Sequence, residues 1–248
     1  GLITAAVGTL FGLPSLRIKG FYLAVATLAA QFFLIWLFNK VGWFYNYSAS
    51  GMINSPPMTV FGFTITGPEG NMTAKYYLVA AIVAVFALAA KNIARGRIGR
   101  NWMAIRDMDI AAELIGVRPL IAKLSAFAVS SFYVGMAGAL YFAVWLGSAE
   151  ATEAFDINQS FLVLFMIIIG GLGSVLGSFL GAAFLVILPI MLKNILVDGL
   201  GTDSALATHL EFIIVGILII GFLIVEPHGL ARLWRIAKEK LRLWPFPY

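Results

Sequence analysis

Long runs of apolar residues recur along the chain, and they restrict its fold more than any other feature of the sequence. An α-helix needs about 20 mostly apolar residues to cross the hydrocarbon core of a bilayer. Seven stretches are candidates for such helices: residues 1–12, 21–38, 76–90, 124–146, 161–169, 175–192 and 212–225. The fifth is expected to begin near residue 157, and an earlier start near residue 205 is open for the seventh. Broken and re-entrant helices are common in transporters, which leaves that alternative open for the shorter stretches. The sequence therefore predicts an all-α fold, a polytopic transmembrane helical bundle.

The composition agrees with a membrane protein and excludes several kinds of chemistry. Charged residues make up 12% of the chain, about half of their usual share in soluble domains. The absence of cysteine rules out disulfides, thiol chemistry and Cys-ligated metals. The two histidines, His209 and His228, lie near the ends of apolar stretches and are expected at the membrane interface rather than on a metal. The net charge of +5 comes from residues beside the apolar stretches, so no nucleic-acid partner is expected.

Basic residues are concentrated in two of the connecting segments. Twelve of the 17 Lys and Arg residues lie there, seven in residues 91–123 and five in residues 231–248. The positive-inside rule predicts that both segments face the cytoplasm. The segment 147–157 holds Glu150, Glu153 and Asp156 and no Lys or Arg, whereas residues 39–75 hold only Lys40 and Lys75. Both are expected outside, and the number of intervening spans gives the same result.

These patterns predict a single transmembrane domain over residues 1–230 and a basic cytoplasmic tail over residues 231–248. The chain begins inside an apolar run at Gly1, from which we expect further spans to precede it. The outer loop 39–75 is rich in Gly, Pro, Asn, Ser and aromatic residues, and connections of this length are often functional. It is predicted to dock an extracytoplasmic partner, to cap a pore, or to be an ordinary solvent-exposed loop.

A glycine cluster lies between the fifth and sixth apolar stretches and continues into the sixth. Gly170 and Gly171 are followed by Gly173, Gly177 and Gly181, which recur every four residues. On a helix this spacing places the last three glycines on one face. Small residues allow membrane helices to approach closely. The cluster indicates either helix packing alone or a thin seam beside a translocation pathway.

One charged stretch stands between two apolar ones: RNWMAIRDMDIAAELIGVRP, residues 100–119. Residues 101–116 are predicted to form one helix of roughly four turns. Asp109 and Glu113 share a face, Gly116 can end the helix, and Pro119 fits a break just after it. The segment is too polar to cross a bilayer. It is predicted to be either an amphipathic interfacial helix or a short helix, with a small alanine patch, that docks into a cytosolic partner.

The remaining motifs restrict how the chain could drive transport. The Gly-x-x-x-x-Gly-Lys-Ser/Thr pattern of ATP-binding loops does not occur. Any use of ATP would therefore require another chain. Charged residues are nearly absent from the predicted spans. This argues against a proton-coupled or ion-coupled carrier, which normally needs carboxylates or His within the membrane.

The order Asp109-Ile-Ala-Ala-Glu113-Leu-Ile-Gly116 resembles the cytoplasmic coupling loop of ABC importer permeases, in the version found in the LivM-type permease subunits of branched-chain amino acid importers. Three further segments resemble that family in the same order: GLPSLRIKGFYLAVATLA (12–29), KLSAFAVSSFYVGMAGALY (123–141) and MIIIGGLGSVLGSFLGAAFLVILP (166–189). The chain departs from the family at Phe21, where an acidic residue is expected, and in the strongly aromatic stretch 29–39.

The resemblance implies a type II ABC importer permease-like fold with a cytoplasmic coupling helix. It assigns contact with the ATPase to six residues of the coupling loop: Arg106, Asp109, Ala111, Ala112, Glu113 and Gly116. It also makes five glycines candidates for close helix packing near the pathway: Gly170, Gly171, Gly173, Gly177 and Gly181. The chain would be a transport subunit rather than an enzyme, located in the bacterial cytoplasmic (inner) membrane.

The implied partners are a second homologous permease, two cytosolic ATP-binding subunits, an extracytoplasmic substrate-binding protein and membrane lipid. ATP and Mg would be bound by the ATPase subunits, so no cofactor is expected in this chain. The implied cargo is a branched-chain or related hydrophobic amino acid. A urea or short-amide ABC permease, a stand-alone channel or carrier, and a membrane scaffold without transport activity are the alternatives.

Overall fold

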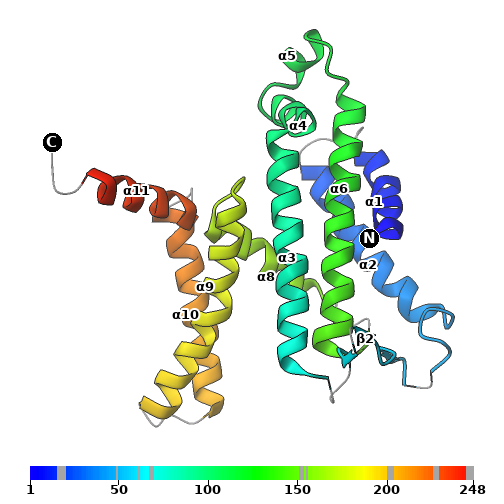
Figure 1. Cartoon of the computed structure of the whole chain (residues 1–248), viewed down its shortest axis with the longest axis vertical. Helices are drawn as coiled ribbons and strands as arrows, with labels where there is room; N and C mark the ends of the chain where they lie inside the picture. The colour runs from blue at the N-terminus through cyan, green and yellow to red at the C-terminus, as the bar shows by residue number, and fades with distance from the viewer. Residues whose placement is uncertain are drawn as a thin grey trace. The chain divides into compact units, whose positions relative to one another are not determined.

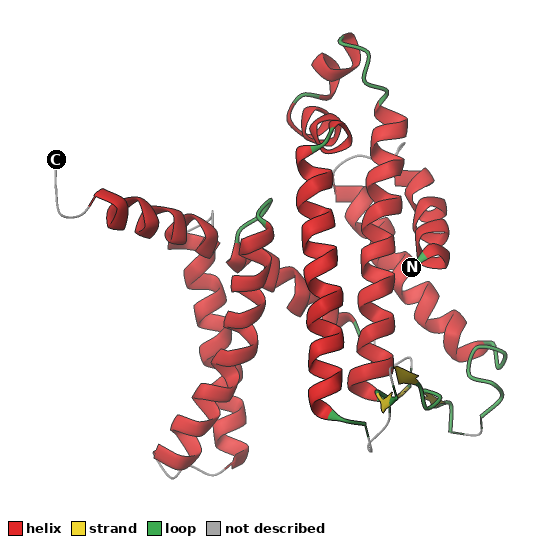
Figure 2. Ribbon diagram, in the orientation of Figure 1, coloured by secondary structure: helices red, strands yellow, loops and turns green. Residues whose placement is uncertain are grey.

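The computed structural model describes residues 1–15, 21–48, 50–60, 62–66, 70–150, 154, 156–199, 204–225 and 229–243. Helices dominate these residues, and strands are few and short (Figure 2). The predicted helical membrane fold is confirmed. The chain divides into two compact units, Gly1–Asp156 and Ile157–Tyr248, which are described separately. Arg17, Lys19, Glu153 and His228 lie outside the described residues.

The first unit contains four apolar helices and a pair of short helices between the last two of them (Figure 1). The helices are α1 (Leu2–Ser15), α2 (Phe21–Lys40), α3 (Met72–Arg95), α4 (Arg97–Asp107), α5 (Asp109–Leu114) and α6 (Pro119–Leu140), which continues as the π-helix η1 (Tyr141–Leu146). Helix α3 begins earlier than the apolar pattern predicts. The reason is Asn71, whose side chain accepts hydrogen bonds from the backbone N–H groups of Thr73 at 3.0 Å and Ala74 at 3.4 Å.

Helices α1 and α6 approach each other closely where a glycine of one helix faces a small side chain of the other. A Cβ atom built on Gly135 of α6 would lie 2.7 Å from Cβ of Thr4, and one built on Gly8 of α1 would overlap the side chain of Ser131. Helix α3 meets α6 through aromatic side chains instead. The Tyr133 hydroxyl donates to the Phe86 carbonyl at 3.1 Å, and the two rings stand edge to face. Small residues and aromatic residues thus make two different contacts with α6.

The two segments predicted to lie outside meet at one end of this unit. Strand β1 (Ile53–Asn54) pairs antiparallel with β4 (Ser148–Ala149), with Ile53 opposite Ala149. A second hairpin joins β2 (Thr59–Val60) to β3 (Phe63–Thr64). Helices α4 and α5 lie at the other end of the unit (Figure 1). The long helices α3 and α6 connect these two ends.

The second unit contains α8 (Ile157–Gly170), α9 (Val175–Asn194), the π-helix η2 (Ile195–Gly199), α10 (Ser204–Val225) and α11 (Gly229–Leu243). The Ser174 side chain starts α9 by accepting a hydrogen bond from the Gly177 N–H at 3.1 Å. Phe184 of α9 and Phe222 of α10 pack edge to face, with ring centroids 5.3 Å apart. The predicted domain boundary at 230–231 falls inside α11, so the basic segment begins as part of this helix.

Three helical segments of the described chain are long and apolar enough to cross a membrane: Met72–Arg95, Pro119–Leu146 and Val175–Val197. A fourth results if α10 and α11 are counted as one bent span. Shorter apolar helices are Leu2–Leu13, Val25–Lys40 and Ile157–Gly170. The chain is therefore a multi-pass membrane protein.

Replacement of Gly135 by leucine tests the close contact of α1 with α6. We expect Gly135→Leu to lower the thermal unfolding midpoint in detergent micelles, because the new side chain meets Thr4 and overpacking costs about 1–3 kcal/mol. Gly138→Leu is the matched control on the same helix, since a Cβ there meets nothing within 4 Å. Equal midpoints for the two variants would contradict the contact.

Candidate functional site

Residues 97–116, which we call the hook, form a compact helical segment between α3 and α6. The chain turns sharply at its start, where a Cβ atom on Gly99 would overlap the backbone carbonyls of Ile93 and Ala94. Only glycine fits this turn. The Arg100 guanidinium then donates to the Arg95 carbonyl at 2.9 Å, which fastens α4 to the end of α3.

A small apolar cluster and a hydrogen bond fasten the hook to α6. Ile105, Ala112 and Ala122, one residue from each of α4, α5 and α6, are all buried together. The Trp102 indole N–H donates to the Ser125 hydroxyl at 2.9 Å. The Ser125 hydroxyl in turn donates to the Ala122 carbonyl at 2.9 Å. The hook is therefore attached to the first two turns of α6 by both packing and polar contacts.

The prediction of one helix over residues 101–116 is wrong, because the helix breaks at Met108. That residue has φ −150° and ψ 89°, and α5 begins directly after it. The break allows Ala112 to contact Ile105. In a straight helix these residues, seven apart, would lie about 10 Å apart along the axis. Asp109 suits the start of the new helix, where a carboxylate meets the positive end of the helix dipole, and its side chain accepts from the Ile110 N–H at 2.9 Å.

Gly116 ends α5 with a φ of +89°, a conformation that favours glycine. Its N–H donates to the Glu113 carbonyl at 2.9 Å, and the Val117 N–H donates to the Ala112 carbonyl at 3.0 Å. This pair of bonds is the Schellman motif. The break predicted just after this helix separates α5 from α6, and Pro119 is the first residue of α6, a position where its missing N–H costs nothing.

The outward surface of α5 combines two carboxylates with large apolar side chains. Asp109, Ala111 and Glu113 are exposed, and Ala112 is only 2% exposed. Ile110 and Leu114 are 75% and 84% exposed and lie on the side of the helix opposite Ala112. The sequence reasoning did not select these two residues, although their i, i+4 spacing opposite the buried alanine was a usable signal. Carboxylates beside them favour a protein partner over lipid.

Arg106 is engaged with its neighbour rather than with the other predicted residues. Its Nε donates to Asp107 Oδ1 at 2.8 Å, and both side chains are exposed. This hydrogen bond lowers the pKa of Asp107. Among the described residues, neither Asp109 nor Glu113 is ion-paired with a Lys or Arg. The two carboxylates of α5 thus remain available to an external cation.

The glycine cluster brings α8 and α9 into backbone contact. A Cβ atom on Gly177 would lie 2.6 Å from the Gly170 carbonyl oxygen, and one on Gly181 would lie 2.9 Å from Gly170 Cα. All three glycines are buried, as is Gly171 in the turn, where φ is +108°. Gly173 does not share their face. It lies in the turn before α9 with φ +80°, because the helix starts only at Val175.

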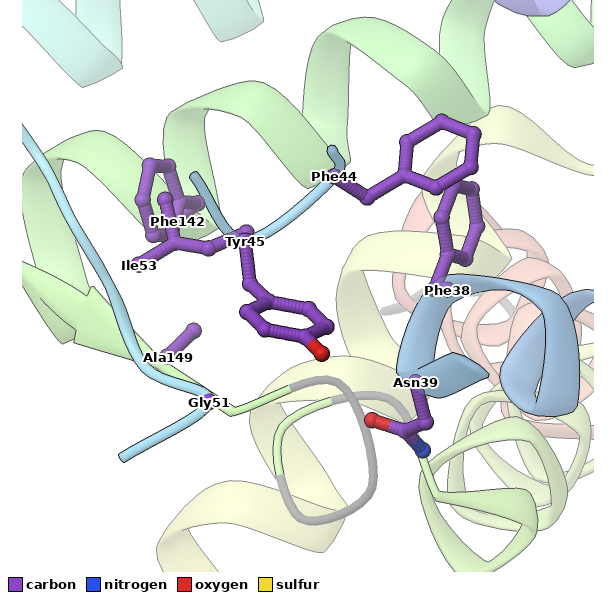
Figure 3. A pocket seen from close by; sticks show the side chains of 8 residues that line it. All are labelled: Phe38, Asn39, Phe44, Tyr45, Gly51, Ile53, Phe142 and Ala149. Carbon is purple, nitrogen blue, oxygen red and sulfur yellow. The ribbon is translucent and has the colours of Figure 1, made fainter. Parts of the chain in front are cut away.

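An apolar pocket lies at the end of the first unit remote from the hook (Figure 3). It has a volume of about 250 Å³ and is lined by Phe38, Asn39, Phe44, Tyr45, Gly51, Ile53, Phe142 and Ala149. The pairing of β1 with β4 places Ile53 beside Ala149, and η1 supplies Phe142. The Tyr45 hydroxyl and the Asn39 amide are the polar side-chain groups of the lining (Figure 3). The sequence reasoning did not identify this pocket.

The pocket can take an apolar group and offers it a small polar edge. The described residues of its lining include no charged side chain. Phe38 and Phe44 stand edge to face with their ring centroids 4.7 Å apart, which gives one wall a fixed aromatic surface. Among the described residues, no three His, Asp or Glu side chains are grouped closely enough to hold a metal ion.

Comparisons with known proteins give a consistent match. The family described as the permease component of the branched-chain amino acid transport system matches residues 1–223. The high-affinity branched-chain amino acid transport system permease protein LivM of Escherichia coli is 35% identical over 75% of this chain and 48% of its own length. The Salmonella typhimurium protein of the same name is 34% identical with the same coverage. The probable branched-chain amino acid transport permease protein LivM of Methanocaldococcus jannaschii is 24% identical over 90% of this chain and 64% of its own length.

The chain spans about half the length of the two bacterial relatives. No solved structure matches.

Enlarging Ala112 tests whether the hook is fastened to α6 as described. Ala112→Leu should overpack the cluster and cost about 1–3 kcal/mol locally. We expect faster hydrogen exchange of the amides in residues 109–117, measured by mass spectrometry on the purified chain. Ala111→Leu is the matched control, because its exposed position should change local stability by less than about 0.5 kcal/mol. Equal exchange in both variants would show that Ala112 is not the attachment point.

Proposed function

The chain belongs to the LivM-type family of branched-chain amino acid transport permeases, which it matches over residues 1–223, and from that membership we propose that it is a permease subunit of an ATP-driven ABC importer. Its cargo is a branched-chain or related hydrophobic amino acid. The subunit forms half of the translocation pathway and a second homologous permease forms the other half. The chain performs no catalysis itself.

Energy enters through two cytosolic ATP-binding subunits, which hold ATP and Mg. An extracytoplasmic binding protein delivers the cargo. The subunit lies in the bacterial cytoplasmic (inner) membrane, with the hook and the basic C-terminal segment on the cytoplasmic side. The concentration of Lys and Arg in residues 91–123 and 231–248 supports this orientation. The same orientation is supported by the pairing of β1 with β4, which joins the two loops that contain few or no Lys and Arg residues at the opposite end of the first unit.

The observation that carries the proposal is the surface of α5. A helix with two unpaired carboxylates, Asp109 and Glu113, and two exposed apolar side chains, Ile110 and Leu114, is suited to a groove in a partner that offers both cations and apolar surface. The hook is also fastened to α6 through Ala112 and Trp102. A force on α5 is therefore transmitted to α6 rather than absorbed by a loose loop.

Helix α6 connects the hook to the pocket. The segment Pro119–Leu146 has 28 residues, which corresponds to about 40 Å of helix. A tilt of about 10° at the hook would move the far end by about 7 Å over this length. Phe142 lies at that end, in the wall of the pocket. ATP-driven closure of the ATPases would thus shift the population between two states of the pathway.

The pocket supports a small hydrophobic cargo. Its volume of about 250 Å³ lies below the range of about 300–1,000 Å³ for drug-sized ligands. Its lining of aromatic and aliphatic side chains suits an aliphatic group, and the Tyr45 hydroxyl and Asn39 amide offer hydrogen bonds to a polar one. An ionic cargo would find no countercharge among the described residues of the lining.

Charge reversal at Glu113 tests the docking of the hook. We expect Glu113→Lys to reduce recovery of the ATP-binding subunits with the affinity-purified permease complex by about tenfold, equivalent to about 1.4 kcal/mol. ATP-dependent uptake of radiolabelled leucine into proteoliposomes should fall in parallel. The measurement is quantitative co-purification followed by uptake.

Glu239→Lys is the control, since it makes the same exchange in α11, outside the hook. This variant should retain the ATPases and transport normally. Wild-type recovery and uptake by Glu113→Lys would overturn the proposed role of α5.

A further inference from the structure

Helix α11 (Gly229–Leu243) is not used by the transport mechanism above and carries a distinct chemistry. It holds five basic residues, Arg232, Arg235, Lys238, Lys240 and Arg242, and a single acidic one, Glu239. With 15 residues and this charge it cannot cross a bilayer by itself. Its position is therefore determined by how it leaves the bundle and by what covers its two faces.

The start of α11 is fastened to the glycine turn between α8 and α9. Gly229 is buried with φ +73°, and a Cβ atom there would lie 2.6 Å from Gly171 Cα and 2.7 Å from the Ile169 carbonyl oxygen. From this contact the chain turns away from α10 (Figure 1). The axes of Thr208–Ile224 and Gly229–Arg242 differ by 63°, which is closer to the right angle between a span and the membrane plane than to a continued span.

The helix has two opposite faces. At 100° per residue, Leu230, Leu233, Trp234, Ala237 and Leu241 fall within an arc of about 100°. Arg235 and Arg242 lie about 150° and 130° around the helix from the centre of this arc, and Lys238 lies at its flank, about 90° away. Glu239 is on the same polar side as the two arginines. The apolar face is not covered by the described chain, since Trp234 is 58% and Leu241 75% exposed. A binding partner that has an apolar layer next to a layer of negative charge would cover the apolar face and attract the basic one.

We propose that α11 lies in the membrane interface and binds anionic phospholipid headgroups. The apolar face enters the boundary of the acyl chains, with Trp234 at the depth where its ring is stable. Arg235, Lys238 and Arg242 then lie at the level of the phosphates, where an anionic surface attracts them. The buried contact of Gly229 with Gly171 holds the helix at this depth. The proposal requires only that the chain spans a membrane, and not that it carries a particular cargo.

The absence of cysteine from the chain makes a direct test possible. A spin label is attached to Leu241→Cys on the apolar face and, separately, to Glu239→Cys on the polar side, in the full chain reconstituted into nanodiscs. We expect the label at 241 to be shielded from a water-soluble nickel reagent by roughly threefold or more relative to the label at 239. Oxygen, which partitions into lipid, should show the opposite order.

Lipid charge is then varied. Nanodiscs of phosphatidylcholine are compared with nanodiscs that contain phosphatidylglycerol, and soluble glycerol phosphate is added as a headgroup without chains. We expect phosphatidylglycerol, and not glycerol phosphate, to move the label at 241 deeper into the bilayer and to raise the thermal unfolding midpoint of the protein. The triple variant Arg235→Gln, Lys238→Gln, Arg242→Gln should lose this dependence, whereas Lys240→Gln, outside the cationic face, should keep it.

Two results would overturn the proposal. One is equal exposure of the labels at 241 and 239 to the nickel reagent in every lipid. The other is shielding at 241 that appears only when ATP-binding subunits are added, which would identify α11 as a protein-docking helix.

Discussion

Inside a bilayer the hydrophobic effect does not press helices together, because lipid chains are as apolar as the side chains they would replace. Both units of this protein therefore depend on close contact at glycine, with small side chains of the neighbouring helix in the first unit and with its backbone in the second. Helix α1 meets α6 at Gly8 and Gly135, and α8 meets α9 at Gly177 and Gly181. At each place a Cβ atom would overlap a neighbour, so the absence of a side chain at glycine allows these helices to come into contact. The buried contact of Gly229 with the α8–α9 turn extends the same device to the C-terminal helix.

The polar side chains discussed above lie at the ends of the helices rather than along the helix contacts. In the first unit one end carries the hook and the other carries the pocket, and α6 belongs to both. The hook is attached through Ala112 and the bond from Trp102 to Ser125, while the pocket receives Phe142 from the π-helix that ends α6. π-Helices often mark functional positions because their wider turn redirects side chains. A rigid helix with a specialised contact at each end is suited to transmit displacement rather than to bind cargo along its length.

Sequence reasoning located the apolar helices because membrane solvation acts on each segment locally and leaves its signature in composition. It missed the break at Met108, which depends on burial of Ala112 against Ile105 and Ala122. It placed Gly173 on the same helix face as Gly177 and Gly181. In the structure α9 starts only after Ser174, which leaves Gly173 in the preceding turn. The pocket could not be predicted from the sequence because it depends on contacts between distant residues. Ile53 and Ala149 are brought together only by the pairing of β1 with β4.

Opposite charges separate the roles of the two short surface helices. Both α5 and α11 expose large apolar side chains, and apolar exposure alone does not distinguish a lipid-facing helix from a protein-facing one. The carboxylates of Asp109 and Glu113 would be repelled by an anionic membrane surface, whereas the cations of α11 are attracted to it. If α5 docks into a protein as proposed, its two carboxylates would disfavour insertion into such a surface, and its apolar residues would stay accessible to a protein in solution. On the two proposals above, a single physical property of the membrane, its negative surface, would direct α11 into lipid and leave α5 free to dock.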